Sequence, residues 1–137
     1  MAVGVVLLVS ASSNAWAADG ADVIRTHRCS QSRDYCIVVG YSKTSPRRVP
    51  LVIAHKVSGV KGRVYWARWS YQKPGGGTKS SGWKKAGWTG DNGRAPGVAV
   101  EALWGHGERA GGPKFPKGTL LCTQFKGSKQ KACLRLG

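Results

Sequence analysis

One short stretch of the chain combines flat aromatic rings with positive charge and lies among glycines. Such a stretch is expected to be an exposed loop, with little apolar material to bury an indole. Aromatic rings stack on nucleic-acid bases or on the apolar faces of sugars, while Lys and Arg hold phosphate or carboxylate groups. With two arginines of the preceding segment, the expected binding residues are Arg63, Arg68, Trp83, Lys84, Lys85 and Trp88.

A second stretch could carry catalysis. His106, Glu108 and Arg109 supply the base, the acid and the cation that a small secreted ribonuclease would need, and Lys84 or His55 could complete such a site. Residues two apart in a glycine-flanked loop are also typical of solvated surface. We keep the ribonuclease as the alternative to a binding role.

Motifs of other enzyme classes are absent from the sequence. It contains no G-x-S-x-G, no P-loop and no H-E-x-x-H. We therefore expect no cofactor and no metal ion, and we favour a binding protein over an enzyme.

The four cysteines are expected to form two disulfides. They are Cys29, Cys36, Cys122 and Cys133, an even number in a short chain, and their spacing lacks the C-x-x-C pairs of a zinc knuckle. A turn at Gly127-Ser128 would place Cys122 opposite Cys133 on two antiparallel strands, which leaves Cys29 to pair with Cys36. The two other connectivities stay open.

The net charge points to an anionic partner. Lys and Arg number 22 against six acidic residues, a formal charge of +16. Charge of this size indicates partners rather than fold. Candidates are an anionic polymer, a charged cell surface or another secreted protein, and nucleic acid is also a possible ligand.

The N-terminus has the features of an export signal. Residues 2–9 are an apolar run and residues 15–17 read Ala-Trp-Ala, the small-residue pattern of a cleavage site. The run is too short to span a bilayer, so no transmembrane insertion is expected. We expect residues 1–17 to be a signal peptide and the protein to be secreted, that is, extracellular.

Residues 18–28 are polar and aperiodic, and we expect an extended N-terminal arm before a single disulfide-stapled domain at 29–137. An unpaired arm could add itself as a strand to a partner protein through Ile24, Arg25 and Arg28. Ordinary terminal disorder is the alternative.

The hydrophobic pattern predicts an all-β fold. In residues 63–72, Tyr65, Ala67, Trp69 and Tyr71 share one face, which is expected to be the core. Further strands are expected at 37–39, 49–57, 98–104, 119–126 and 129–136, with long glycine-rich loops at 74–97 and 105–116. Five to six short strands of this kind predict a small antiparallel β-sandwich or barrel.

This plan is similar to that of many small exported proteins of Gram-positive bacteria, including antimicrobial proteins, inhibitors and subunits of secreted toxin assemblies. The similarity carries no functional residue. The expected function is a secreted cationic binding protein, antimicrobial or toxin-associated. It would act on an anionic envelope polymer or as the protein-binding subunit of a secreted bacterial complex.

Overall fold

The computed structural model describes residues 22–88, 100–105 and 111–137. Within these residues the chain forms β-strands and no helical element. Five strands make a first sheet, whose order across the sheet is β1 (Val23–Cys29), β2 (Tyr35–Ser42), β3 (Leu51–Lys56), β8 (Val100–Gly105) and β7 (Gly87–Trp88). Five more make a second sheet, namely β10 (Lys131–Arg135), β9 (Leu120–Phe125), β4 (Trp66–Gln72), β5 (Thr78–Ser80) and β6 (Lys84–Lys85), the last two both paired with β4.

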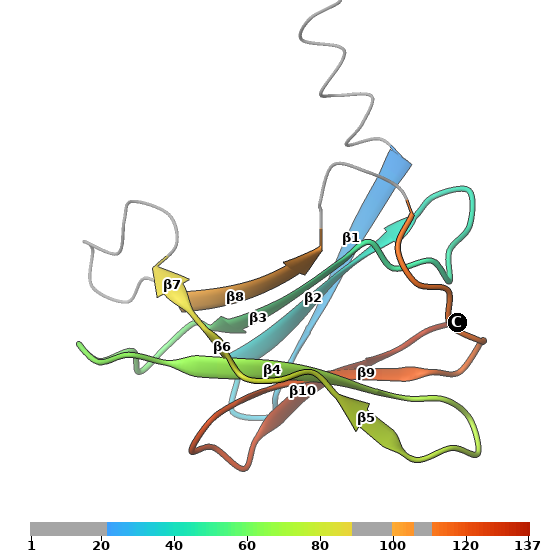
Figure 1. Ribbon diagram of the computed structural model, residues 1–137. Coiled ribbons are helices and arrows are strands. Elements are labelled where there is room, and N and C mark those ends of the chain that lie inside the picture. Colours follow the sequence, from blue (N-terminus) through green and yellow to red (C-terminus); the bar gives the residue numbers. More distant parts are fainter. Residues whose placement is uncertain (1–21, 89–99, 106–110) are drawn as a thin grey trace, which may run out of the picture.

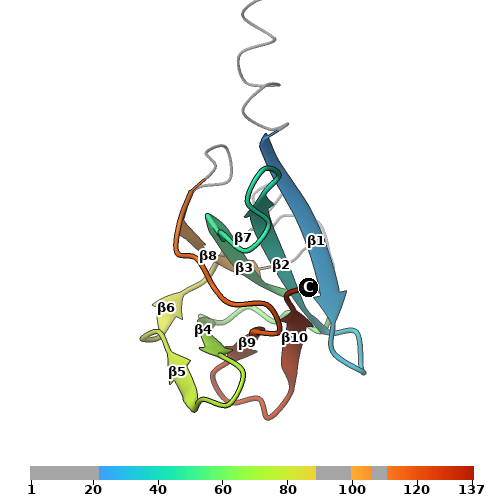
Figure 2. The ribbon, with the colours of Figure 1, turned by 90° about the vertical axis from the view of Figure 1, so that its right-hand side faces the viewer.

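The two sheets lie face to face as the layers of a sandwich (Figure 1). All strand pairs are antiparallel, and the sheets do not close into a barrel. The edge strands β1 and β10 lie on the same side of the sandwich, as Figure 2 shows. The expected all-β class is confirmed, and the sandwich is the correct one of the two expected architectures.

Apolar side chains from both sheets fill the space between the layers. Ile37 and Val39 of β2 are fully buried against Leu121 of β9 and Ala132 of β10. On the expected core face, Ala67 of β4 is fully buried and Tyr65, directly before β4, is nearly so. Trp69 and Tyr71 are only partly buried and pack against the core from the same face. Period-two alternation therefore located the buried side of this strand correctly.

Both expected disulfides are present. Cys29 is bonded to Cys36 and Cys122 to Cys133, and no cysteine of the chain is left free. Each bond joins directly opposite residues of neighbouring strands, β1 with β2 and β9 with β10. The pairing derived from the position of the turn is therefore confirmed.

The turn between β9 and β10 differs from the expected one. Its hydrogen bond runs from Ser128 N to Phe125 O, so Lys126 and Gly127 occupy the central positions instead of Gly127 and Ser128. Gly127 has a φ of 90°, which the third position of a type II turn requires. The strand register is unaffected, since the ladder resumes at Gln124 opposite Lys131.

Two expected irregular segments contain strands, so the strand count exceeds five to six. In the expected arm, every residue from Val23 to Arg28 is paired, because β1 runs antiparallel to β2 from Val23↔Ser42 to Cys29↔Cys36. The expected loop at 74–97 contains β5, β6 and β7, and residues 89–97 lie outside the described part. Single-sequence patterning missed these strands because exposed strands lack an apolar face.

The part of the chain that the structure describes contains no helix with the length and apolar character needed to cross a membrane.

Candidate binding surface

The outer face of the second sheet carries a group of aromatic and basic side chains. On β4, Ala67 points into the core, so Trp66 and Arg68 on either side of it point outward. Trp66, the first residue of β4, is 42% exposed. The sequence predicted that exposed indoles and basic side chains would lie together in a glycine-rich loop. Here a strand also places an exposed indole beside a guanidinium group.

Trp83 lies against this face from the segment that leads into β6. The guanidinium carbon of Arg68 is 4.5 Å from the centre of the Trp83 ring, and the ammonium nitrogen of Lys126 is 5.9 Å from the same centre. Trp83 still exposes 37% of its surface. Arg68 and Lys126 therefore both lie near the ring of Trp83, and the indole remains partly exposed to solvent beside these two positive charges.

The strand register extends this group across the sheet. Arg68 of β4 is opposite Gln124 of β9, and Gln124 is opposite Lys131 of β10. The Arg68 guanidinium donates to Gln124 Oε1 at 3.4 Å, and Gln124 Nε2 donates to the carbonyl of Ser128 at 2.8 Å. Three neighbouring strands therefore place a cation, an amide and a second cation in one row.

A second row lies beside the first. Lys85 of β6 is directly opposite Trp66 of β4, so their side chains share the outer face. We call this surface the basic face, and it consists of Trp66, Arg68, Trp83, Lys85, Lys126 and Lys131, with Gln124 between them.

No acidic side chain comes from the chain segments that build this sheet. None of the six Asp and Glu residues lies within residues 61–88 or 111–137. Of the three acids in the described part, Asp34 accepts a hydrogen bond from Ser58, and Glu101 is paired with His55 on the first sheet. The charged residues are therefore distributed unevenly along the chain: the segments that form the second sheet contain Lys and Arg but no Asp or Glu.

Three of the expected binding residues lie apart from the basic face. Arg63 stacks on the ring of Tyr65, with its guanidinium carbon 5.0 Å from the ring centre. Lys84 points to the opposite side from Lys85, donating to the carbonyl of Leu103 on the first sheet. Trp88 pairs with Val100 in the first sheet and is half-exposed there. The structure thus brings together Arg68, Trp83 and Lys85 and separates the other three.

Trp66, Lys126 and Lys131 were missing from the expected set. Trp66 belongs to the outward face that the alternation of β4 defines, and that signal could have identified it. Lys126 and Lys131 come from the far end of the chain, so only the pairing of β9 with β4 brings them near.

The residues of the expected arm sit on an edge strand. Ile24, Arg25 and Arg28 are all exposed on β1, whose second edge carries no strand in the described part of the molecule. Their role toward a protein partner remains a prediction.

The expected nuclease residues cannot be placed. His106, Glu108 and Arg109 lie outside the described residues. His55, one of the two residues that could have completed that site, has its Nε2 atom 2.6 Å from Glu101 Oε1, across β3 and β8 on the outer face of the first sheet. Lys84, the other, is held by Leu103 as described above.

One lysine is buried at the end of the core. The Lys56 ammonium lies 4.6 Å from the centre of the Tyr35 ring and 5.9 Å from that of Tyr65. Burial raises the pKa of Tyr65, but the Lys61 amide, which donates to its phenol oxygen at 2.8 Å, and the charges of Arg63 and Lys56 outweigh this. The pKa of Tyr65 therefore lies below the ordinary value of 10.0.

Comparison of the chain with protein-family models, with curated proteins and with solved structures finds no match in any of the three.

Proposed function

We propose that this protein is a secreted cationic binding protein whose basic face holds an anionic polymer. The observation that carries the proposal is the joint placement of Arg68 and Lys126 on the ring of Trp83, on a sheet whose segments contribute no carboxylate. Charges attract the polymer, and the exposed side of the indole contacts an uncharged part of its repeat unit.

The arrangement of the basic side chains in rows supports adsorption of a polymer. The basic face is built from side chains that lie side by side on paired strands, and it spans several strands at about 4.8 Å each. An extended polymer can contact such rows at successive repeat units. The mode of action would then be antimicrobial or toxin-associated binding to a charged cell envelope.

Extracellular action is part of the proposal. Two disulfides are compatible with an oxidising compartment outside the cytosol. A charge of +16 would attract anionic polymers of a cell envelope at long range.

The test is retention of the purified protein on beads that carry polyphosphate or a sulfated glycan, at low and at physiological salt. We expect binding at low salt that falls steeply as salt rises, because the polymer releases its counterions on binding. Culture supernatant passed over immobilised protein provides the competing outcome. A discrete protein that stays bound at high salt, with no salt-sensitive polymer binding, would replace this proposal by a protein-binding subunit. Cleavage of RNA by the same preparation would favour the ribonuclease.

A further inference from the structure

The open edge of β1 is a second surface with groups that a partner could bind. β1 is the outermost strand of the first sheet, and within the described residues no strand pairs with its other side. Figure 2 shows β1 at the margin of the sandwich, well away from β4 and β5 of the second sheet. The edge is therefore separate from β4, which carries the centre of the basic face.

The hydrogen bonds at both ends of the β1–β2 pair fix which backbone groups point to this edge. Lys43 N donates to Asp22 O at one end, and Ser30 N donates to Tyr35 O at the other. Hydrogen-bonded positions recur at every second residue of an antiparallel pair, and Asp22 and Ser30 are an even number of residues apart. The even-numbered residues of β1 therefore bond to β2. The N–H and C=O groups that point away from β2 belong to Val23, Arg25, His27 and Cys29.

In the middle of the edge, these outward backbone groups are almost unused. The His27 carbonyl accepts from the exposed guanidinium of Arg28 at 3.2 Å. The structure, over the residues that it describes, gives no other hydrogen bond to the outward groups of Arg25 and His27. A row of such groups is a template for pairing with another extended chain.

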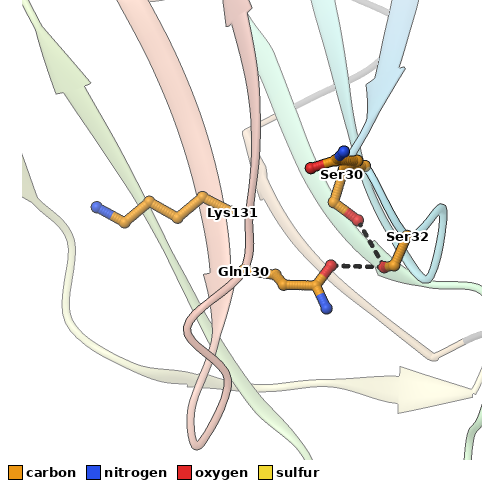
Figure 3. Close-up of a pocket in the computed structure, with 5 residues that line it drawn as sticks. Ser30, Ser32, Gln130 and Lys131 are labelled. Atoms are coloured by element: carbon orange, nitrogen blue, oxygen red, sulfur yellow. Dashed lines mark hydrogen bonds between the residues drawn. The ribbon is translucent and has the colours of Figure 1, made fainter.

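The edge is held in place before any partner binds. The Cys29–Cys36 disulfide closes the turn at the end of β1. Beyond it, Ser32 Oγ donates to Gln130 Oε1, which ties this turn to the residue before β10 of the other sheet (Figure 3). A preformed strand lowers the entropic cost of adding a further one.

The register shows which side chains of β1 would flank an added strand. Thr26 is opposite Val39, which is fully buried in the core, and residues that are paired across a ladder share a face. Thr26 and Arg28 therefore lie on the core side of the first sheet, and Arg25 and His27 lie on its outer side.

A groove runs along the core side of this edge. Its volume is about 300 Å³, and its lining includes Thr26 and Arg28 of β1, Tyr41 of β2, and Leu134 and Leu136 near the end of the chain. A strand added to β1 would direct every second side chain toward this groove. Small apolar side chains suit these positions, because aliphatic and aromatic groups form part of the lining.

The charges along the edge favour an acidic chain. Arg25, His27 and Arg28 are exposed, and no Asp or Glu occurs in residues 23–33. Opposite charges on neighbouring strands stabilise their pairing, and like charges destabilise it. A second copy of this chain would place the same three cationic side chains against one another, so an edge-to-edge dimer is disfavoured.

We propose that the open edge of β1 binds an extended acidic segment of a partner protein as an added strand. In this segment acidic residues alternate with small apolar ones. The acidic side chains lie on the outer side beside Arg25 and His27, and the apolar ones lie over the groove. Backbone hydrogen bonds to the outward groups supply affinity, and the two sets of side chains supply specificity. The inference goes beyond the proposed function, because it assigns a protein partner to a surface other than the basic face.

The probe is a short fluorescent peptide of alternating Glu and Val, titrated with the intact protein at physiological salt. One control peptide replaces every Glu by Lys. A second control carries a methyl group on every backbone amide, which keeps the charge but removes the donors. We expect the acidic peptide to bind, the Lys peptide not to bind, and the methylated peptide to bind roughly tenfold more weakly. Equal binding of the methylated peptide would overturn the added strand.

A matched pair of variants tests the backbone of the edge. His27→Pro removes an N–H that the β1–β2 ladder does not use, and proline is tolerated on the open side of an edge strand. It should weaken peptide binding by roughly tenfold, in line with a lost hydrogen bond and a blocked approach. His27→Ala keeps the N–H and should change the affinity by less than about twofold. Similar affinities for the two variants would contradict the proposal.

A second pair separates the local charges from the total charge. Arg25→Gln/Arg28→Gln should weaken binding of the acidic peptide several-fold. Lys79→Gln/Lys117→Gln removes two exposed cations elsewhere and should leave the affinity unchanged. Equal losses in both variants would show that the peptide follows the net charge of the protein, and the edge would then not be its site.

Amide hydrogen exchange gives a readout that needs no variant. In the free protein the amides of Thr26 and Arg28 should be protected by β2, whereas those of Arg25 and His27 should exchange rapidly. The acidic peptide should protect Arg25 and His27, and binding without this protection would overturn the proposal. A concentration-dependent dimer of the protein alone that His27→Pro abolishes would instead assign the edge to a second copy. Retention of His27→Pro on a sulfated glycan should equal that of the unmodified protein, so this result is independent of the basic face.

Discussion

The guanidinium carbon of Arg68 lies 4.5 Å from the centre of the Trp83 ring, and neither residue is buried in the core. This contact joins β4 to the segment before β6 on the outer surface. Trp83 nevertheless keeps 37% of its surface exposed, so part of the indole remains open to solvent.

We expect the Arg68–Trp83 contact to contribute to stability as well as to binding. In a double-mutant cycle of Arg68→Ala and Trp83→Ala, the coupling in the free energy of unfolding should be about 0.5–1 kcal/mol, the usual value for a surface cation–π pair. Urea unfolding measures it. The pair Arg68→Ala and Trp88→Ala is the control and should be additive, because Trp88 belongs to the other sheet.

The disulfide between β9 and β10 should be a major source of stability. It closes a loop with a sequence separation of 11, and replacing both Cys122 and Cys133 by Ala should lower the free energy of unfolding by about 3 kcal/mol. The Cys29–Cys36 loop has a separation of 7, so its removal should cost slightly less. Denaturant unfolding of the two double variants provides the comparison. A loss below about 1 kcal/mol for both would contradict the entropic account.

The turn at Lys126 and Gly127 should depend on glycine. Gly127 has a φ of 90°, where any other L-residue is strained, so Gly127→Ala should destabilise the protein by about 1–2 kcal/mol. Gly77→Ala is the matched control, because Gly77 lacks a positive φ and has open space around it. Thermal unfolding of the two variants tests this, and equal midpoints would show that the turn is not the strained element.

Tyr65 should make stability depend on pH in the alkaline range. Because its pKa is lower in the folded state than the unfolded value of about 10, the folded state releases the proton more readily. The resulting stabilisation is present above pH 10 and is lost as the pH falls through the folded pKa. Near-ultraviolet absorbance should show an early tyrosine ionisation that Tyr65→Phe removes. Arg63→Gln should move this ionisation back toward pH 10, since one of the charges that lowers the pKa is then gone.

Local pattern was sufficient to predict the fold class, because its signals lie within short segments. The alternation of Tyr65 and Ala67 identified the buried face of β4, and the position of one turn fixed the partner of Cys122. A one-residue error in the turn did not matter, since the register depends only on which residues face each other across it.

The binding surface could be predicted only in part. Arg68 and Trp83 were expected because they are close in sequence, whereas Lys126 and Lys131 reach them through the pairing of β9 and β10 with β4. The reverse error concerned Lys84 and Trp88, which are close to Trp83 in sequence. Lys84 belongs to β6 like Lys85, but its side chain points to the other face of the strand. Trp88 is separated because the chain passes from one sheet to the other between β6 and β7.

The most direct test of the account is the salt dependence of polyanion binding for two variants of equal net charge. Arg68→Gln/Lys126→Gln removes two cations from the basic face, whereas Arg25→Gln/Lys43→Gln removes two exposed cations from the first sheet and its adjoining loop. Affinity for an immobilised sulfated glycan, measured from 50 to about 200 mM salt, gives the log–log slope for each protein. In the basic-face variant the magnitude of the slope should fall by roughly two, one for each lost contact. In the control variant the slope should stay close to that of the unmodified protein. Equal reductions in both variants would show that binding follows total charge, and the basic face would then not be the site.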